Sequence, residues 1–159
     1  MQSELVFQPI RKPGFLSSVF AADDRMATQH ASPKIRVLIV EDDYLAASEA
    51  EAVLNEAGVD VIGIASSADE AVRLAKAERP SLALMDIRLT GARDGVDAAI
   101  ELFREYGVRS VFATAHHDAF IRSRAQPAAP LGWLAKPYTT NALVSVVKSA
   151  AAELNKKSS

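Results

Sequence analysis

From Lys34 onward, short apolar runs alternate along the chain with longer stretches in which apolar residues recur every three or four positions. Five runs have the length of β-strands, and most of them are nearly continuous in apolar residues. Parallel strands that are covered on both faces have this pattern. The predicted strands are Ile35–Val40, Val59–Ala65, Leu82–Met85, Arg109–Ala113 and Leu131–Ala135.

The stretches that follow these runs have the period of amphipathic helices. The clearest one comes after Thr140, where a single apolar stripe is formed by Leu143, Val146, Val147, Ala150, Ala151 and Leu154. A shorter helix is predicted between His117 and Ala125, because Pro127 and Pro130 follow it. Strand–helix–strand connections are almost always right-handed and give parallel strands. Five such units therefore predict an α/β fold, a doubly wound parallel sheet with five helices on its two faces.

The composition narrows the class of protein further. The chain has 159 residues, 49% of them hydrophobic, no cysteine and a formal net charge of -2. These values predict one globular domain, and the lack of cysteine excludes disulfides, thiolate zinc sites and cysteine nucleophiles. No apolar stretch reaches the roughly 18 residues that cross a membrane, so we expect a soluble, cytoplasmic protein. The near-neutral charge argues against a nucleic-acid partner, and we assign Arg122 and Arg124 to a solvated helix face.

Residues 1–33 differ from the rest of the chain. They carry no net charge and show no persistent periodicity, and Pro9, Pro13 and Gly14 interrupt their apolar runs. These runs are too short for the apolar region of a signal peptide. We interpret residues 1–33 as a flexible or loosely docked extension, with Met26 as an alternative translation start. The predicted organisation is this extension, one domain over residues 34–155, and a tail of residues 156–159.

Charged residues or a threonine directly follow four of the five predicted strands. Ligands of an open parallel sheet bind outside the carboxyl ends of its strands, so these side chains are expected to share one edge. They are Glu41, Asp42 and Asp43 after the first strand, Asp86 after the third, Thr114 after the fourth and Lys136 after the fifth. Asp43 also precedes a predicted helix, and we assign it to the N-terminus of that helix.

The chemistry of these side chains indicates a phosphoryl site. Carboxylates that converge on one edge repel one another unless a cation compensates their charge. An all-oxygen cluster without His or Cys suits Mg²⁺ or Mn²⁺ rather than zinc. A lysine and a hydroxyl beside such a cluster are suited to stabilising a phosphoryl group, and an aspartate is a competent nucleophile for an aspartyl phosphate.

Over residues 34–154 the sequence resembles the receiver domains of two-component response regulators. The motifs that carry the resemblance are VLIVEDD at 37–43, LMDIRL at 84–89, the pair Asp94-Gly95, ATA at 113–115 and the run Lys136-Pro137-Tyr138. The resemblance implies a flavodoxin-like sheet with strand order 2-1-3-4-5 and a receiver domain over residues 34–155. It also implies that Asp86 is the phosphoacceptor.

The resemblance assigns roles to the residues around this aspartate. Asp42 matches the carboxylate that ligates Mg²⁺ directly, and Glu41 matches its neighbour, which acts largely through water. The backbone carbonyl of Arg88 matches a further metal ligand beside the phosphoacceptor. Thr114 matches the hydroxyl that hydrogen-bonds the phosphoryl group, and Lys136 matches the lysine that pairs with it.

Three features depart from the commonest receivers. Trp133 falls on the aromatic switch position, which is usually Tyr or Phe. The loop between Asp86 and Gly95 is one residue longer than usual. His116 and His117 follow ATA in the loop that sets access to the phosphoryl group, and we interpret them as a polar loop and not as a metal site.

Together these observations predict a single-domain response regulator. It would accept a phosphoryl group on Asp86 from a sensor histidine kinase or a histidine phosphotransfer protein and signal through contacts with a downstream protein. Homodimerisation through the face of the fourth helix, fifth strand and fifth helix is a further expectation from the family. Beyond its own phosphorylation and dephosphorylation, we expect no enzymatic activity.

Two alternatives remain open at this point. The first is a metal-dependent phosphotransfer or phosphohydrolase enzyme on a similar sheet. Such enzymes often carry two aspartates separated by one residue after a strand, whereas Arg88 stands at the second position here. The second alternative is a receiver fold that acts as an interaction module without switching, against which the intact acidic set argues.

Overall fold

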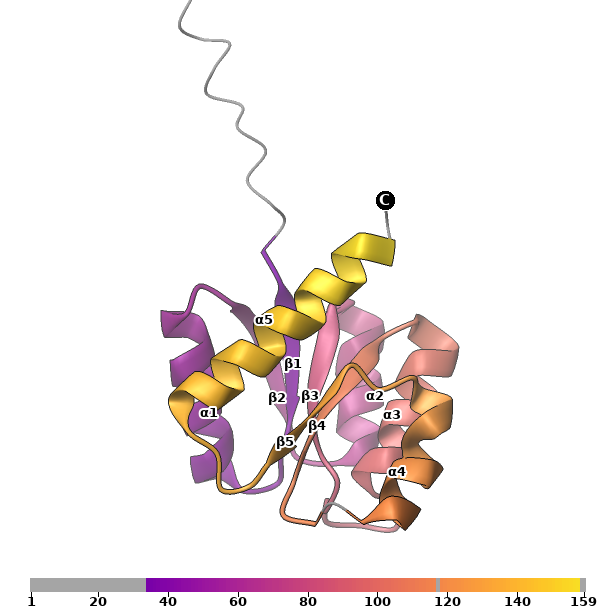
Figure 1. Ribbon diagram of the computed structural model, residues 1–159. Coiled ribbons are helices and arrows are strands. Elements are labelled where there is room, and N and C mark those ends of the chain that lie inside the picture. Colours follow the sequence, from indigo (N-terminus) through magenta and orange to yellow (C-terminus); the bar gives the residue numbers. More distant parts are fainter. Residues whose placement is uncertain (1–33, 117, 158–159) are drawn as a thin grey trace, which may run out of the picture. The chain divides into compact units, whose positions relative to one another are not determined.

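A computed structural model describes residues 34–116 and 118–157. They form one five-stranded parallel sheet with the order β2-β1-β3-β4-β5 (Figure 1). The strands are β1 Arg36–Val40, β2 Asp60–Ala65, β3 Leu82–Asp86, β4 Arg109–Thr114 and β5 Gly132–Ala135. The predicted fold class and strand order are confirmed. The extension, the alternative start at Met26, His117 and residues 158–159 lie outside the described residues.

Helices cover both faces of the sheet, as Figure 1 shows. On one face lie α1 Tyr44–Glu56 and α5 Thr140–Lys157; on the other lie α2 Ala68–Glu78, α3 Gly95–Tyr106 and α4 Ala119–Ala125, followed by the short 3₁₀ turn η1 Gln126–Ala128. No helix among the described residues combines the length and the apolar character needed to cross a membrane.

The core consists of two apolar layers, one on each face of the sheet. Successive side chains of a strand point to opposite faces, so Leu38 and Val40 of β1 pack with α2 and α3, whereas Val37 and Ile39 pack with α1 and α5. All four side chains are at most 1% exposed. This two-sided burial explains the continuous apolar runs in the sequence.

Several predicted boundaries of strands and helices were wrong by one or two residues. β3 and β4 include Asp86 and Thr114, because the parallel pairing of these strands continues to their last residues. α4 begins at Ala119 because the Asp118 side chain accepts a hydrogen bond from the Ile121 amide and caps the helix there. α5 extends to Lys157, and cations are favourable in the last turn of a helix.

Candidate functional site

The carboxyl edge of the sheet brings the predicted site residues together. β1 and β3 are neighbours, so Glu41 and Asp86 lie side by side. β4 separates β5 from β3, but the long side chain of Lys136 crosses that distance. Its Nζ lies 2.5 Å from Glu41 Oε2 and 3.3 Å from Asp86 Oδ2. One ammonium therefore compensates two carboxylates at this edge.

Glu41, Asp42 and Asp86 could hold a divalent cation. Each offers one carboxylate oxygen, and the three oxygens lie within 4.8 Å of one another. A cluster of only carboxylate oxygens is the donor set that Mg²⁺ or Mn²⁺ prefers. The Arg88 amide donates to Asp86 Oδ1 at 3.3 Å, which holds the loop carrying the predicted carbonyl ligand against the carboxylate. The residues present thus fit the metal that the sequence predicts.

Burial makes the pairing of Glu41 with Lys136 necessary. Glu41 is 8% exposed and Asp86 is 9% exposed. Burial raises the pKa of Glu41, and the hydrogen bond from Lys136 opposes this rise. Burial alone would lower the pKa of Lys136, but its contact with Glu41 and the charge of Asp86 raise it instead. Lys136 therefore stays charged at neutral pH.

Asp42 is held by a residue that the sequence analysis did not assign to the site. Its Oδ2 accepts hydrogen bonds from the Thr90 hydroxyl and from the Thr90 amide, the latter at 3.1 Å. The hydroxyl contact is the main cause that lowers the pKa of Asp42. Thr90 lies in the lengthened β3–α3 loop, which was the only signal for it in the sequence. The loop therefore reaches back over the acidic cluster.

The hydroxyl of Thr114 faces the loop before α4. Thr114 is 4% exposed, and its Oγ1 donates to the His116 carbonyl at 3.1 Å and accepts from the His116 amide at 3.1 Å. The hydroxyl proton is thus committed to this loop. A guanidinium nitrogen of Arg88 lies 3.2 Å from Nδ1 of His116, which joins the loops after β3 and β4 beside the site.

Trp133 packs towards α4. Its ring stacks on the buried Phe112 with centroids 4.9 Å apart, and the guanidinium carbon of Arg122 lies 4.7 Å from the ring centroid. The assignment of Arg122 and Arg124 to a solvated face was incomplete. Arg122 is exposed but covers the indole, and Arg124 forms ion pairs with α3. Cation–π contact and ion pairing explain why both side chains lie along the protein surface.

Asp43 has the structural role that the sequence predicts. Its Oδ1 accepts hydrogen bonds from the amides of Leu45 and Ala46, at 2.9 and 3.1 Å, and caps α1. Its own amide donates to Glu41 Oε1 at 3.1 Å. Asp43 therefore orients Glu41 through the backbone, while its carboxylate is engaged by the helix.

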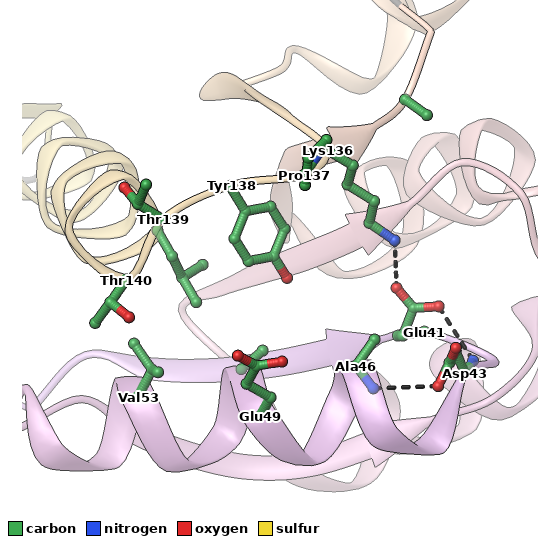
Figure 2. A pocket seen from close by; sticks show the side chains of 13 residues that line it. Glu41, Asp43, Ala46, Glu49, Val53, Lys136, Pro137, Tyr138, Thr139 and Thr140 are labelled. Atoms are coloured by element: carbon green, nitrogen blue, oxygen red, sulfur yellow. Dashed lines mark hydrogen bonds and ion pairs between the residues drawn. The ribbon is translucent and has the colours of Figure 1, made fainter.

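A cavity of about 750 Å³ opens beside the acidic cluster, between α1 and the loop that leads into α5. Figure 2 shows Glu41 and Lys136 at one end of it and Tyr138 between them and Thr139. Burial raises the pKa of Tyr138. Glu41 of the carboxylate cluster and Lys136, which contacts it, both line this cavity, so the cavity adjoins the site although Asp86 does not line it.

The close approach of two backbone segments explains why residue 95, at the start of α3, is a glycine. A Cβ added at this residue would lie 1.8 Å from the backbone oxygen of Asp86. The Gly95 amide also donates to the Ile87 carbonyl at 2.8 Å. The first turn of α3 therefore rests directly on the backbone of Asp86, in a space that admits no side chain.

We expect Gly95→Ala to destabilise the protein by about 3 kcal/mol, because the backbone of β3 must move to admit a methyl group. Urea denaturation followed by circular dichroism measures this loss. Gly63→Ala is the matched control, since its Cβ would lie 3.5 Å from Leu74 Cδ1, an ordinary contact distance. Equal stability of the two variants would contradict the close approach at Gly95.

Several solved structures that are similar to this chain are signal receiver domains. The receiver domain of a modulated diguanylate cyclase from Desulfovibrio desulfuricans G20 is 38% identical, with a TM-score of 0.71, and the match covers 77% of this chain and 97% of that one. The chain belongs to the response regulator receiver domain family, whose model matches residues 37–148.

Two curated relatives that the chain resembles are regulatory proteins. The transcriptional regulatory protein PdtaR of Mycobacterium tuberculosis is 34% identical over 72% of this chain and 56% of its own length. The phyllosphere-induced regulator PhyR of Methylorubrum extorquens is 35% identical over 69% of this chain and 42% of its own length. The chain thus matches about half of the length of these relatives.

Proposed function

We propose that this protein accepts a phosphoryl group on Asp86 from a histidine kinase or a histidine phosphotransfer protein. The observation that carries the proposal is the position of Lys136, whose ammonium contacts both Asp86 and Glu41 beside a cluster of three carboxylates. An ammonium in this place can pair with phosphoryl oxygens once the aspartate is modified. The cytoplasm, where nucleoside triphosphates supply such donors, is the proposed compartment.

Mg²⁺ is the proposed cofactor, held by Asp42, Asp86 and the Arg88 carbonyl, with Glu41 acting through water. When bound, it would neutralise charge on the phosphoryl oxygens. Asp42 is presented for this role by its hydrogen bonds from Thr90. Glu41 is oriented by Lys136 and by the Asp43 amide, which leaves its carboxylate facing the other two.

In the proposed transfer, a carboxylate oxygen of Asp86 attacks the phosphorus of the donor phosphohistidine. An oxygen–phosphorus bond forms, the phosphorus–nitrogen bond breaks, and the donor imidazole keeps the electron pair. Lys136 stabilises the negative charge on the transferred oxygens. Thr114 then turns its hydroxyl from the His116 carbonyl to a phosphoryl oxygen, which releases the loop before α4.

The proposed output is a change in the face formed by α4, β5 and α5. Trp133 lies on this face between Phe112 and Arg122, so a shift of the loop before α4 would alter its packing. Phe120 of α4 is 74% exposed and offers an apolar contact to a partner. A downstream protein or a second copy of this chain is the proposed partner of the face.

Incubation with acetyl phosphate and Mg²⁺ tests the proposed function. We expect a mass increase of one phosphoryl group, stable in acid and labile in base, that maps to the peptide containing Asp86. Omission of Mg²⁺ should remove the adduct. A failure to form it would overturn the proposal, and steady hydrolysis of phosphate esters by the same sample would favour a phosphohydrolase.

A further inference from the structure

Helix α4 has few apolar contacts with the core, against which Ile121 packs in part. Among its seven residues, all of which the structure describes, only Ala125 is buried. A helix with so little apolar contact is free to shift unless specific side-chain interactions position it. The ion pairs of Arg124 supply such an interaction with α3, beside which α4 lies in Figure 1.

Both terminal nitrogens of the Arg124 guanidinium contact carboxylates at the N-terminus of α3. Its two terminal nitrogens each lie 2.7 Å from a different oxygen of Asp94, and one of them lies 3.0 Å from Asp97. This forked geometry fixes direction as well as distance, which a single charge contact would not. Although burial opposes it, the contact with Arg124 holds the pKa of Asp94 below its usual range.

Asp94 connects the Arg124 contacts to the backbone of the proposed phosphoacceptor. Its Oδ1 accepts hydrogen bonds from the amides of Val96 and Asp97, at 2.9 and 3.0 Å, so it also caps α3. The next residue, Gly95, rests on the Asp86 carbonyl. Arg124 therefore ties α4 to the segment that carries Asp86.

A second connection reaches α4 through the chain itself. The Thr114 hydroxyl donates a hydrogen bond to the carbonyl of His116, which lies two positions before Asp118, the residue that caps α4. If the hydroxyl turns towards Asp86, the loop must follow and α4 is pulled. The Arg124 contacts oppose such a movement, because they anchor α4 to α3.

We propose that Arg124 is a positioning residue that clamps α4 to the N-terminus of α3 in the resting arrangement and thereby weakens binding of a phosphoryl group at Asp86. The inference rests on the proposed function of Asp86. Coupling between two sites is reciprocal: if occupation of Asp86 releases α4, release of α4 favours occupation of Asp86. Loosening the clamp should therefore strengthen binding at Asp86.

The test is a calorimetric titration of the full chain with beryllofluoride in the presence of Mg²⁺, since this anion imitates a phosphoryl group on a carboxylate. We expect Arg124→Gln to lower the apparent Kd about five-fold. Arg124→Lys keeps the charge but loses the forked geometry, so its apparent Kd should lie between those of Arg124→Gln and the wild type. Its milder change also serves if Arg124→Gln does not fold.

Arg36→Gln is the matched control. Arg36 has a similar exposure, 39% against 34% for Arg124, and it also forms two ion pairs, with Asp60 and Glu78 at the amino end of β1. We expect it to lower stability without changing the Kd for beryllofluoride. An unchanged or a higher Kd in both Arg124 variants would overturn the clamp. Absence of binding by the wild type would instead overturn the proposed function of Asp86.

Discussion

Asp86→Asn should form no phosphoryl adduct with acetyl phosphate under conditions in which the wild type is modified. A carboxamide lacks the nucleophilic, charged oxygen that the transfer requires, and it offers Lys136 no negative charge. The variant should fold, because Asp86 lies beside Glu41 and its charge contributes to raising the pKa of that carboxyl. Removing one of two neighbouring carboxylates relieves repulsion between them. Intact-protein mass spectrometry measures the adduct.

Asp43→Asn is the control for this variant. Asp43 directly follows Asp42 in the chain and is also acidic, but its carboxylate caps α1, a role that asparagine fills equally well. We expect this variant to be phosphorylated like the wild type. An adduct that persists in Asp86→Asn would assign the phosphoryl group to another carboxylate of the cluster, and the assignment of Asp86 would then be wrong.

Lys136→Met should slow phosphorylation by acetyl phosphate about 10²- to 10³-fold, the usual cost of removing one preorganised charge from a transition state. Methionine keeps the length of the side chain, so the change concerns mainly the ammonium that contacts Asp86 and Glu41. The initial rate of adduct formation is the measurement. Lys148→Met, on the exposed side of α5, should have no effect.

The stability of Lys136→Met should depend on pH differently from that of the wild type. Burial already raises the pKa of Glu41, and Lys136 opposes this rise, so its removal should raise the pKa further. A carboxyl whose pKa is higher in the folded state favours folding at low pH, and this contribution is lost as the pH rises through the folded-state value. Relative to the wild type, Lys136→Met should therefore lose stability as the pH rises. If the difference in unfolding free energy between Lys136→Met and the wild type stayed constant as the pH rises, Lys136 would not influence the pKa of Glu41.

The acidic residues and the lysine could be predicted from the sequence because strand ends are visible in it. Asp86 ends a buried apolar run, and an ionised side chain in that place is costly without partners. The lysine was predicted at the same edge because it also follows a strand. The structure brings Glu41, Asp42, Asp86 and Lys136 together as expected.

Other features were missed because they depend on side-chain reach. The extra length of the loop after β3 is visible in the sequence, but the hydrogen bonds from Thr90 in that loop to Asp42 span 48 positions of the chain. Arg124 was assigned to a solvated face, yet it pairs with Asp94, 30 positions earlier. Neither pairing leaves a periodic signal, since each joins two single residues on different elements.

By itself, the sequence determined the alternation of strands and helices and the set of residues that share the carboxyl edge, because hydrophobic period and crossover handedness are local properties of the chain. The resemblance to receiver domains added the strand order. Only the tertiary structure decided which side chain each site residue contacts: Thr90 on Asp42, Arg124 on Asp94, Arg122 over Trp133. The physical reason is that such contacts depend on the packing of distant elements and on rotamers within that packing, neither of which a linear pattern contains.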